Sequence, residues 1–173
     1  MMRQLRHFAS RAVPCAAIGL VLAACGGGKS GPAAPTPGVP LLSNLVATFL
    51  QACTSTSGFT GTVLAFTVDY RDSDGDIRGG TLQSTVTLQP SNTSQDLNFS
   101  LPSANATVTG TTEGQVQAAG CLRFGSQTGG RLSVAVVDAA GHSSNVVATQ
   151  LNRPSGAPEV PQGGTDGAFG PLN

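Results

Sequence analysis

The chain has 173 residues, and nine Lys or Arg residues balance nine Asp or Glu residues to give a formal net charge of zero. Only 10% of the residues are charged, and beyond the N-terminal segment the basic ones occur singly. Nucleic-acid binding needs a basic face that displaces counterions from phosphates, so this class of function is excluded. Thr, Ser, Gly, Asn and Gln are abundant, which is typical of exported β proteins.

The N-terminus has the features of a secretory signal. Arg3, Arg6 and Arg11 precede an uncharged run that ends at Leu22, and small residues follow this run. The run is too short to span a bilayer, because a transmembrane helix needs about 20 residues. We therefore expect residues 1–24 to be a cleaved signal peptide.

The four residues Leu22-Ala23-Ala24-Cys25 resemble a bacterial lipobox at every position. The resemblance implies that Cys25 receives a diacylglyceryl group, that cleavage follows Ala24, and that the new amino terminus is acylated. Two or more acyl chains hold a protein firmly in a bilayer. Gly26 after the cysteine implies, by similarity to Gram-negative sorting rules, the outer membrane. We therefore expect a lipid-anchored protein of the cell envelope.

Removal of the signal leaves one domain with a Gly/Pro-rich segment on each side. Residues 25–40 contain the lipidated cysteine and a linker with little to bury, and residues 154–173 have a similar composition. We expect both segments to be disordered and residues 41–153 to fold as one domain, a monomer. Six basic residues against nine acidic ones give this mature chain a formal charge of minus three.

Alternation of apolar and polar residues predicts strands with one buried face. In residues 62–70, for example, Leu64, Phe66 and Val68 share one side of the strand. Further strands are predicted at residues 81–88, 97–101, 131–138 and 145–151, the last two as a hairpin, with weaker candidates at 106–111 and 115–124.

Residues 41–53 are ambiguous. Their apolar positions fit a helical stripe, yet Val46, Thr48 and Phe49 also suit a first strand, which we favour. Counting this segment gives seven or eight short strands, with turn signals every eight to twelve residues. This spacing predicts an all-β fold, a single immunoglobulin-like β-sandwich.

Two motifs are similar to parts of the Ig-like domains of bacterial surface and secreted proteins. Residues 66–77, Phe-Thr-Val-Asp-Tyr-Arg-Asp-Ser-Asp-Gly-Asp-Ile, resemble a strand with its acidic turn. Residues 134–145, Val-Ala-Val-Val-Asp-Ala-Ala-Gly-His-Ser-Ser-Asn, resemble the closing hairpin of these domains. The resemblance implies a fold used for display and adhesion, although such folds host many functions.

Cys53 and Cys121 remain once Cys15 leaves with the signal and Cys25 is lipidated. An even pair of cysteines in an exported domain most often forms a disulfide. Closing a loop of about 70 residues would stabilise the fold by roughly 4 kcal/mol. The alternative is two separate buried thiols.

Asp72, Asp74 and Asp76 place three carboxylates within five residues, a pattern that suits Ca²⁺. The loop is not an EF-hand, because its glycine, Gly75, precedes the third aspartate instead of following it, and Gln83 stands at the twelfth position in place of Glu. We favour the other interpretation, a solvated turn in which the Asp side chains cap backbone amides, and keep a calcium site at Asp72, Asp74 and Asp76 as the alternative. We expect no other cofactor.

The chain offers little for catalysis. Asp138, His142, Ser143 and Ser144 are triad residue types, but they crowd into one hairpin, whereas a triad converges from separate elements. Turn formation explains them better, with Asp138 organising the turn. We therefore predict a non-enzyme.

Such a domain has three candidate functions, of which we favour the first. The first is a structural or protein-binding module with another envelope protein as its partner, and the second is a calcium-dependent adhesion or carbohydrate-binding module. The third is an inactive accessory of a secreted hydrolase. Sugar binding by a sandwich usually relies on aromatic faces, yet Phe59, Phe99 and Phe124 are expected in the core and the sole Tyr is Tyr70.

Overall fold

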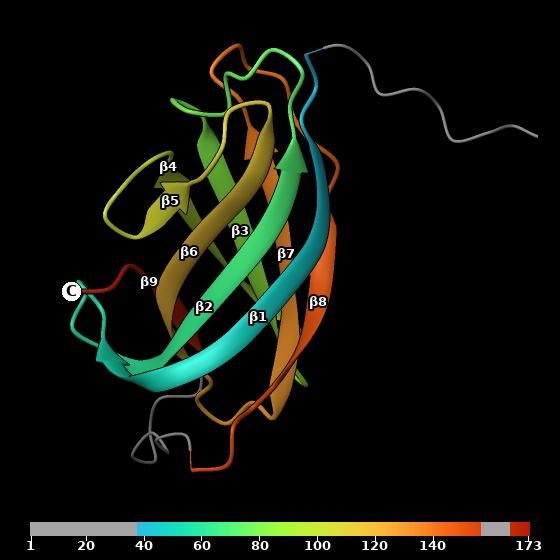
Figure 1. Cartoon of the computed structure of the whole chain (residues 1–173). Coiled ribbons are helices and arrows are strands. Elements are labelled where there is room, and N and C mark those ends of the chain that lie inside the picture. The colour runs from blue at the N-terminus through green and yellow to red at the C-terminus, as the bar shows by residue number, and fades with distance from the viewer. Residues whose placement is uncertain (1–37, 157–166) are drawn as a thin grey trace, which may run out of the picture. The chain divides into compact units, whose positions relative to one another are not determined.

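The computed structural model describes residues 38–156 and 167–173. The predicted signal peptide, the lipobox with Cys25, and residues 26–37 of the linker lie outside these ranges. Within them, no helix is long and apolar enough to cross a membrane. The regular elements are strands (Figure 1), namely β1 (Leu41–Thr54), β2 (Thr60–Arg71), β3 (Thr81–Gln89), β4 (Thr93–Ser100), β5 (Ala106–Val108), β6 (Glu113–Arg123), β7 (Gly129–Val137), β8 (Val147–Asn152) and β9 (Ala168–Gly170).

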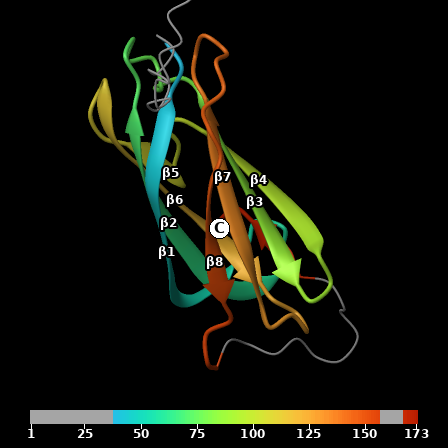
Figure 2. The ribbon, with the colours of Figure 1, turned by 90° about the vertical axis from the view of Figure 1, so that its right-hand side faces the viewer.

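The strands form two antiparallel sheets that Figure 2 shows as two layers. One sheet has the order β1-β2-β6-β5, with β9 also paired to β6, and the other has the order β4-β3-β7-β8. When β1 to β8 are lettered A, B, C, C′, D, E, F and G, these orders read A-B-E-D and C′-C-F-G. This is the strand arrangement of the immunoglobulin fold. The predicted all-β, immunoglobulin-like sandwich is therefore confirmed.

The core lies between the two sheets and is built from the inward positions that the alternation predicts. Leu64, Phe66 and Val68 on β2 are at most 2% exposed. The facing strands β3 and β7 contribute residues such as Leu82 and Leu132, both fully buried. Since alternate side chains of a strand point to opposite faces, the register of each predicted strand fixes which residues enter this core.

The ambiguous segment at residues 41–53 is a strand, β1, at the edge of its sheet. Its pairing with β2 shifts between Ser43 and Val46 and again between Phe49 and Ala52. Each β-bulge inserts a residue and disturbs the period of two. The apolar residues consequently recur at spacings of three and four, which is why the segment also resembles a helical stripe.

The C-terminal tail is a correction to the sequence analysis. Disorder was expected throughout residues 154–173, yet β9 pairs with β6 and the side chain of Phe169 is only 7% exposed. Gly120 on β6 leaves room for the Phe169 ring, which occupies the position of a side chain at residue 120. The expectation is therefore wrong for residues 167–173, while residues 157–166 lie outside the described ranges. The expected disorder of residues 25–40 is also wrong at residues 38–40, where Gly38 and Pro40 are buried.

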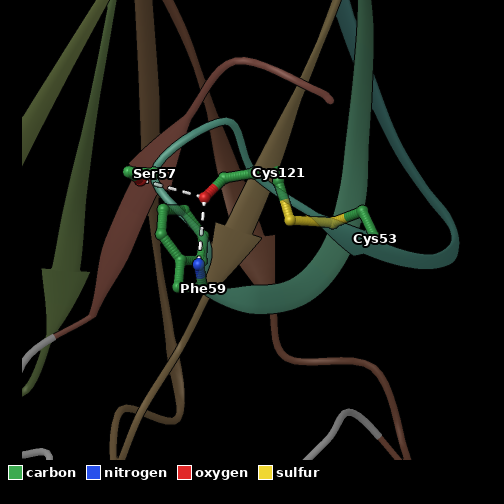
Figure 3. The surroundings of a disulfide bond; sticks show 5 residues. Cys53, Ser57, Phe59 and Cys121 are labelled. Atoms are coloured by element: carbon green, nitrogen blue, oxygen red, sulfur yellow. Dashed lines mark hydrogen bonds between the residues drawn. A yellow bond between two sulfur atoms is a disulfide. The ribbon is translucent and has the colours of Figure 1, made fainter.

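The structure confirms the Cys53–Cys121 disulfide, with the two Cα atoms 5.8 Å apart (Figure 3). It joins β1 to β6 across the first residues of β2, where Gly61 pairs with Cys53. In antibody domains the bridge connects the two sheets, whereas here it connects two strands of one sheet.

Candidate metal centre

The acidic motif lies in the loop that carries the chain from β2 in one sheet to β3 in the other. Two contacts fix this loop: the N–H of Asp72 donates a 2.7 Å hydrogen bond to the carbonyl of Thr112, and Ile77 is fully buried in the core. Gly75, at φ +74°, adopts the left-handed conformation that favours glycine. The carboxylates are therefore presented by a loop that is anchored at both ends.

The structure brings the three predicted carboxylates together and adds a fourth. Asp138 follows β7, and one oxygen from each of Asp72, Asp74, Asp76 and Asp138 lies within 4.8 Å of the others. Two oxygens on opposite sides of Ca²⁺ are about 5 Å apart, because each lies 2.3 to 2.6 Å from the ion. The spread of the four oxygens therefore fits a single coordination sphere.

Hydrogen bonds hold the two acidic segments against each other. Asp76 accepts from the N–H of Ala140 through Oδ2, at 3.0 Å, and from the N–H of Ala139 through its carbonyl, at 3.1 Å. Asp138 accepts from the N–H of His142 at 2.7 Å, and its other oxygen lies 3.1 Å from Nδ1 of the same residue. Asp138 thus organises the turn, as predicted, and also faces the cluster.

Two carboxylate oxygens in the cluster have no hydrogen-bond partner. Asp72 is 1% exposed, and its Oδ2 accepts from the N–H of Ile77 at 3.0 Å while its Oδ1 is unpaired. Oδ1 of Asp76 is buried and unpaired as well. Within the described ranges, Arg123 Nε is the one other buried side-chain polar atom that has no hydrogen-bond partner. Such atoms are rare in native structures, and two at one place indicate a missing positive partner.

The negative charge of the cluster also indicates that a positive partner is missing. The pKa of Asp72 is raised from 3.8 to about 6. Burial is the main cause, and the neighbouring carboxylates of Asp74 and Asp76 contribute to the same rise. Two unit charges 4 Å apart near a protein surface repel by about 4 kcal/mol. A divalent cation would remove this repulsion and satisfy the unpaired oxygens.

The donor set fits a hard cation. All four side chains supply carboxylate oxygens, the ligands that Ca²⁺ and Mg²⁺ prefer. They come from two irregular loops rather than from regular strands. Ca²⁺ tolerates irregular geometry with six to eight ligands, whereas Mg²⁺ requires a near-ideal octahedron, so the arrangement favours Ca²⁺.

His142, Ser143 and Ser144 of the β7–β8 connection are engaged in the turn. Ser144 accepts from the N–H of Val136 at 2.9 Å and donates to the carbonyl of Asn145 at 2.8 Å. His142 pairs with Asp138, and Ser143 forms a backbone bridge to β7. Their contacts are those of a folded turn.

The aromatic residues lie in the core or against it, and the carboxylate of Asp69 is held by hydrogen bonds. Tyr70, Phe99 and Phe124 are buried, while Phe59 is partly buried with the Arg123 guanidinium 5.3 Å from its ring centre. Asp69 accepts from side-chain amides on two neighbouring strands, and these hydrogen bonds lower its pKa.

No protein-family model matches the chain, and a search of curated proteins gives no match. The assignment of this centre therefore rests on its geometry.

Proposed function

We propose that the chain is a lipid-anchored cell-envelope protein whose Ig-like domain binds Ca²⁺ through Asp72, Asp74, Asp76 and Asp138. The observation that carries the calcium site is the unpaired, buried Oδ1 of Asp72 inside a group of four carboxylates. The lipobox at Cys25 supports the anchor, and the disulfide supports an oxidising compartment outside the cytoplasm.

The role of the ion in this proposal is structural. It joins the loop that crosses between the sheets to the turn that follows β7, next to the hydrogen bonds from Ala139 and Ala140 to Asp76. Extracellular modules commonly bind Ca²⁺ with dissociation constants of about 10⁻⁴ to 10⁻³ M. At such concentrations the ion would stabilise one end of the sandwich for display to an envelope partner.

The calcium site is tested by titration of the mature chain carrying Cys25→Ser, which keeps it soluble. We expect binding of one Ca²⁺ by calorimetry, a rise in melting temperature, and loss of both in Asp138→Asn. Asp96→Asn is the matched control, because Asp96 lies on β4, outside the cluster, and accepts from Thr85. Absence of heat and of any rise in melting temperature at millimolar Ca²⁺ would overturn the site.

The anchor is tested separately in the host cell. Metabolic labelling with an acyl chain should mark the wild type and not Cys25→Ser, and the labelled protein should fractionate with the outer membrane. A protein that is secreted without label would contradict this part of the proposal.

A second function, calcium-dependent adhesion or carbohydrate binding, is favoured by the exposure of Asp74. Four carboxylates need not fill the six to eight positions of Ca²⁺, and the exposed side leaves positions for hydroxyl or carboxylate oxygens of a ligand. A glycan screen with and without Ca²⁺ tests it, since retention should require both the ion and Asp74.

A further inference from the structure

The first described residues of the chain lie directly at the carboxylate cluster. Gly38 is buried, and its N–H donates a 2.9 Å hydrogen bond to the hydroxyl of Ser73 in the acidic loop. A Cβ atom at this position would lie 2.9 Å from Oδ2 of Asp74 and 3.5 Å from Cε1 of His142. Gly38 therefore sits between the two loops that supply the carboxylates.

The residues that follow are fastened to the same surroundings. Pro40 is buried, and Leu42 is 3% exposed. The N–H of Leu42 donates to Oδ1 of Asn145 at 2.7 Å, and Nδ2 of Asn145 donates back to the carbonyl of Leu42 at 3.0 Å. Asn145 belongs to the β7–β8 connection that also carries Asp138. Residues 38–42 are thus attached to the acidic loop at one end and to the β7–β8 connection at the other.

We infer that residues 38–42, where the linker joins the sandwich, form part of the cation site, so that Ca²⁺ binding and the docking of this segment stabilise each other. The inference rests on the proposed calcium site. The ion would fix the Asp74 carboxylate, against which Gly38 packs, and the β7–β8 connection, which holds Leu42. Coupling of this kind is reciprocal, because each event changes the equilibrium of the other by the same factor.

The coupling has a consequence for a protein on a lipid anchor. Residues 38–42 are the first described residues after the linker. Calcium would therefore hold the base of the linker on the sandwich, and these residues would act through the Asp74 carboxylate and Asn145 rather than as ligands of the ion.

Gly38 allows a sharp test. Its φ of +77° disfavours any residue with a Cβ, and an added Cβ would displace the Asp74 carboxylate. Gly58 is a matched control, because its φ is +86° and nothing lies within 4 Å of an added Cβ. Gly38→Ala and Gly58→Ala therefore share the backbone strain and differ in their contact with the cluster.

Calcium titration of the mature Cys25→Ser chain carrying these changes measures the coupling. We expect Gly38→Ala to weaken Ca²⁺ binding by about fivefold or more, the lower end of typical coupling strengths, and Gly58→Ala to leave the affinity unchanged. Equal affinities for Gly38→Ala and Gly58→Ala would overturn the inference while leaving the calcium site in place. An unaltered chain that binds no Ca²⁺ would overturn both.

Hydrogen exchange provides a second readout, whose first step uses the unaltered chain. In the unaltered domain, Ca²⁺ should slow exchange at the N–H groups of Gly38 and Leu42. Ser73→Ala, which removes the hydroxyl that accepts from Gly38, should reduce that protection at Gly38. Calcium binding without any change in exchange at these two positions would contradict the coupling.

Discussion

Asp72 is a buried carboxylate with a raised pKa. Its side chain is almost completely buried, one of its oxygens is unpaired, and the carboxylates of Asp74 and Asp76 add to the rise in its pKa. A buried carboxylate without a positive partner favours its neutral form. Asp72 therefore opposes folding at neutral pH unless a cation lies beside it.

This cost predicts the pH dependence of stability without calcium. The folded-state pKa of Asp72 is raised from 3.8 to about 6, so its contribution to stability is fully present below pH 3.8 and is lost as pH rises through about 6. We expect the Asp72 contribution to the melting temperature of the calcium-free chain to fall between pH 5 and pH 7. Asp72→Asn should lack this contribution and melt higher than the unaltered chain at pH 7.

Thermal melts in metal-free buffer compare the two chains directly. Their difference in melting temperature should grow from pH 5 to pH 7, and added Ca²⁺ at pH 7 should raise the melting temperature of the unaltered chain alone. A difference that does not vary with pH would show that Asp72 titrates as an ordinary exposed carboxylate.

At the scale of elements, local alternation predicts the strands well, because inward and outward residues follow directly from the period of two. It does not predict what depends on the stacking of the sheets. Asp138 joins Asp72 only because the β2–β3 loop and the β7–β8 turn meet at one end of the sandwich. The sequence therefore indicated three of the four carboxylates, and assigned the fourth to its turn alone.

Strand β9 shows a different reason for failure. Three residues within a Gly- and Pro-rich tail are too few to show a period, and their strand structure comes from pairing with Cys121–Arg123 of β6. The one local signal is Phe169, a large apolar side chain in a segment with little else to bury. Its burial depends on the space above Gly120, which is a long-range property.

Phe169→Ala tests whether β9 contributes to the fold. Truncation of a buried Phe typically costs about 3 to 5 kcal/mol, and we expect a loss near the lower value because the strand is short. Leu50→Ala, at a position 58% exposed on β1, is the control and should change stability little. Urea unfolding measures both, and an unchanged midpoint for Phe169→Ala would mean that the tail is not docked in solution.

At the scale of the whole molecule, the Cys53–Cys121 bridge ties the first strand of the domain to β6 across 68 residues of sequence. A disulfide that closes a loop of this length stabilises the folded state by about 4 kcal/mol, because it reduces the conformational entropy of the unfolded chain. Replacing both cysteines by alanine should lower the melting temperature by more than about 10 °C. Reduced unaltered protein should melt close to the double variant, whereas a variant that melts like the oxidised protein would contradict a stabilising bridge.

The bridge and the proposed anchor support the proposal of an exported module, and the proposed calcium centre would distinguish this module from a sandwich that serves only as a spacer. The most direct measurement of that centre is an anomalous diffraction map from crystals of the Cys25→Ser chain grown with millimolar CaCl₂. The proposal predicts one calcium peak at about 2.3 to 2.6 Å from the unpaired Oδ1 atoms of Asp72 and Asp76, with Asp74 and Asp138 beside it. An ordered cluster with no peak in such crystals would contradict it.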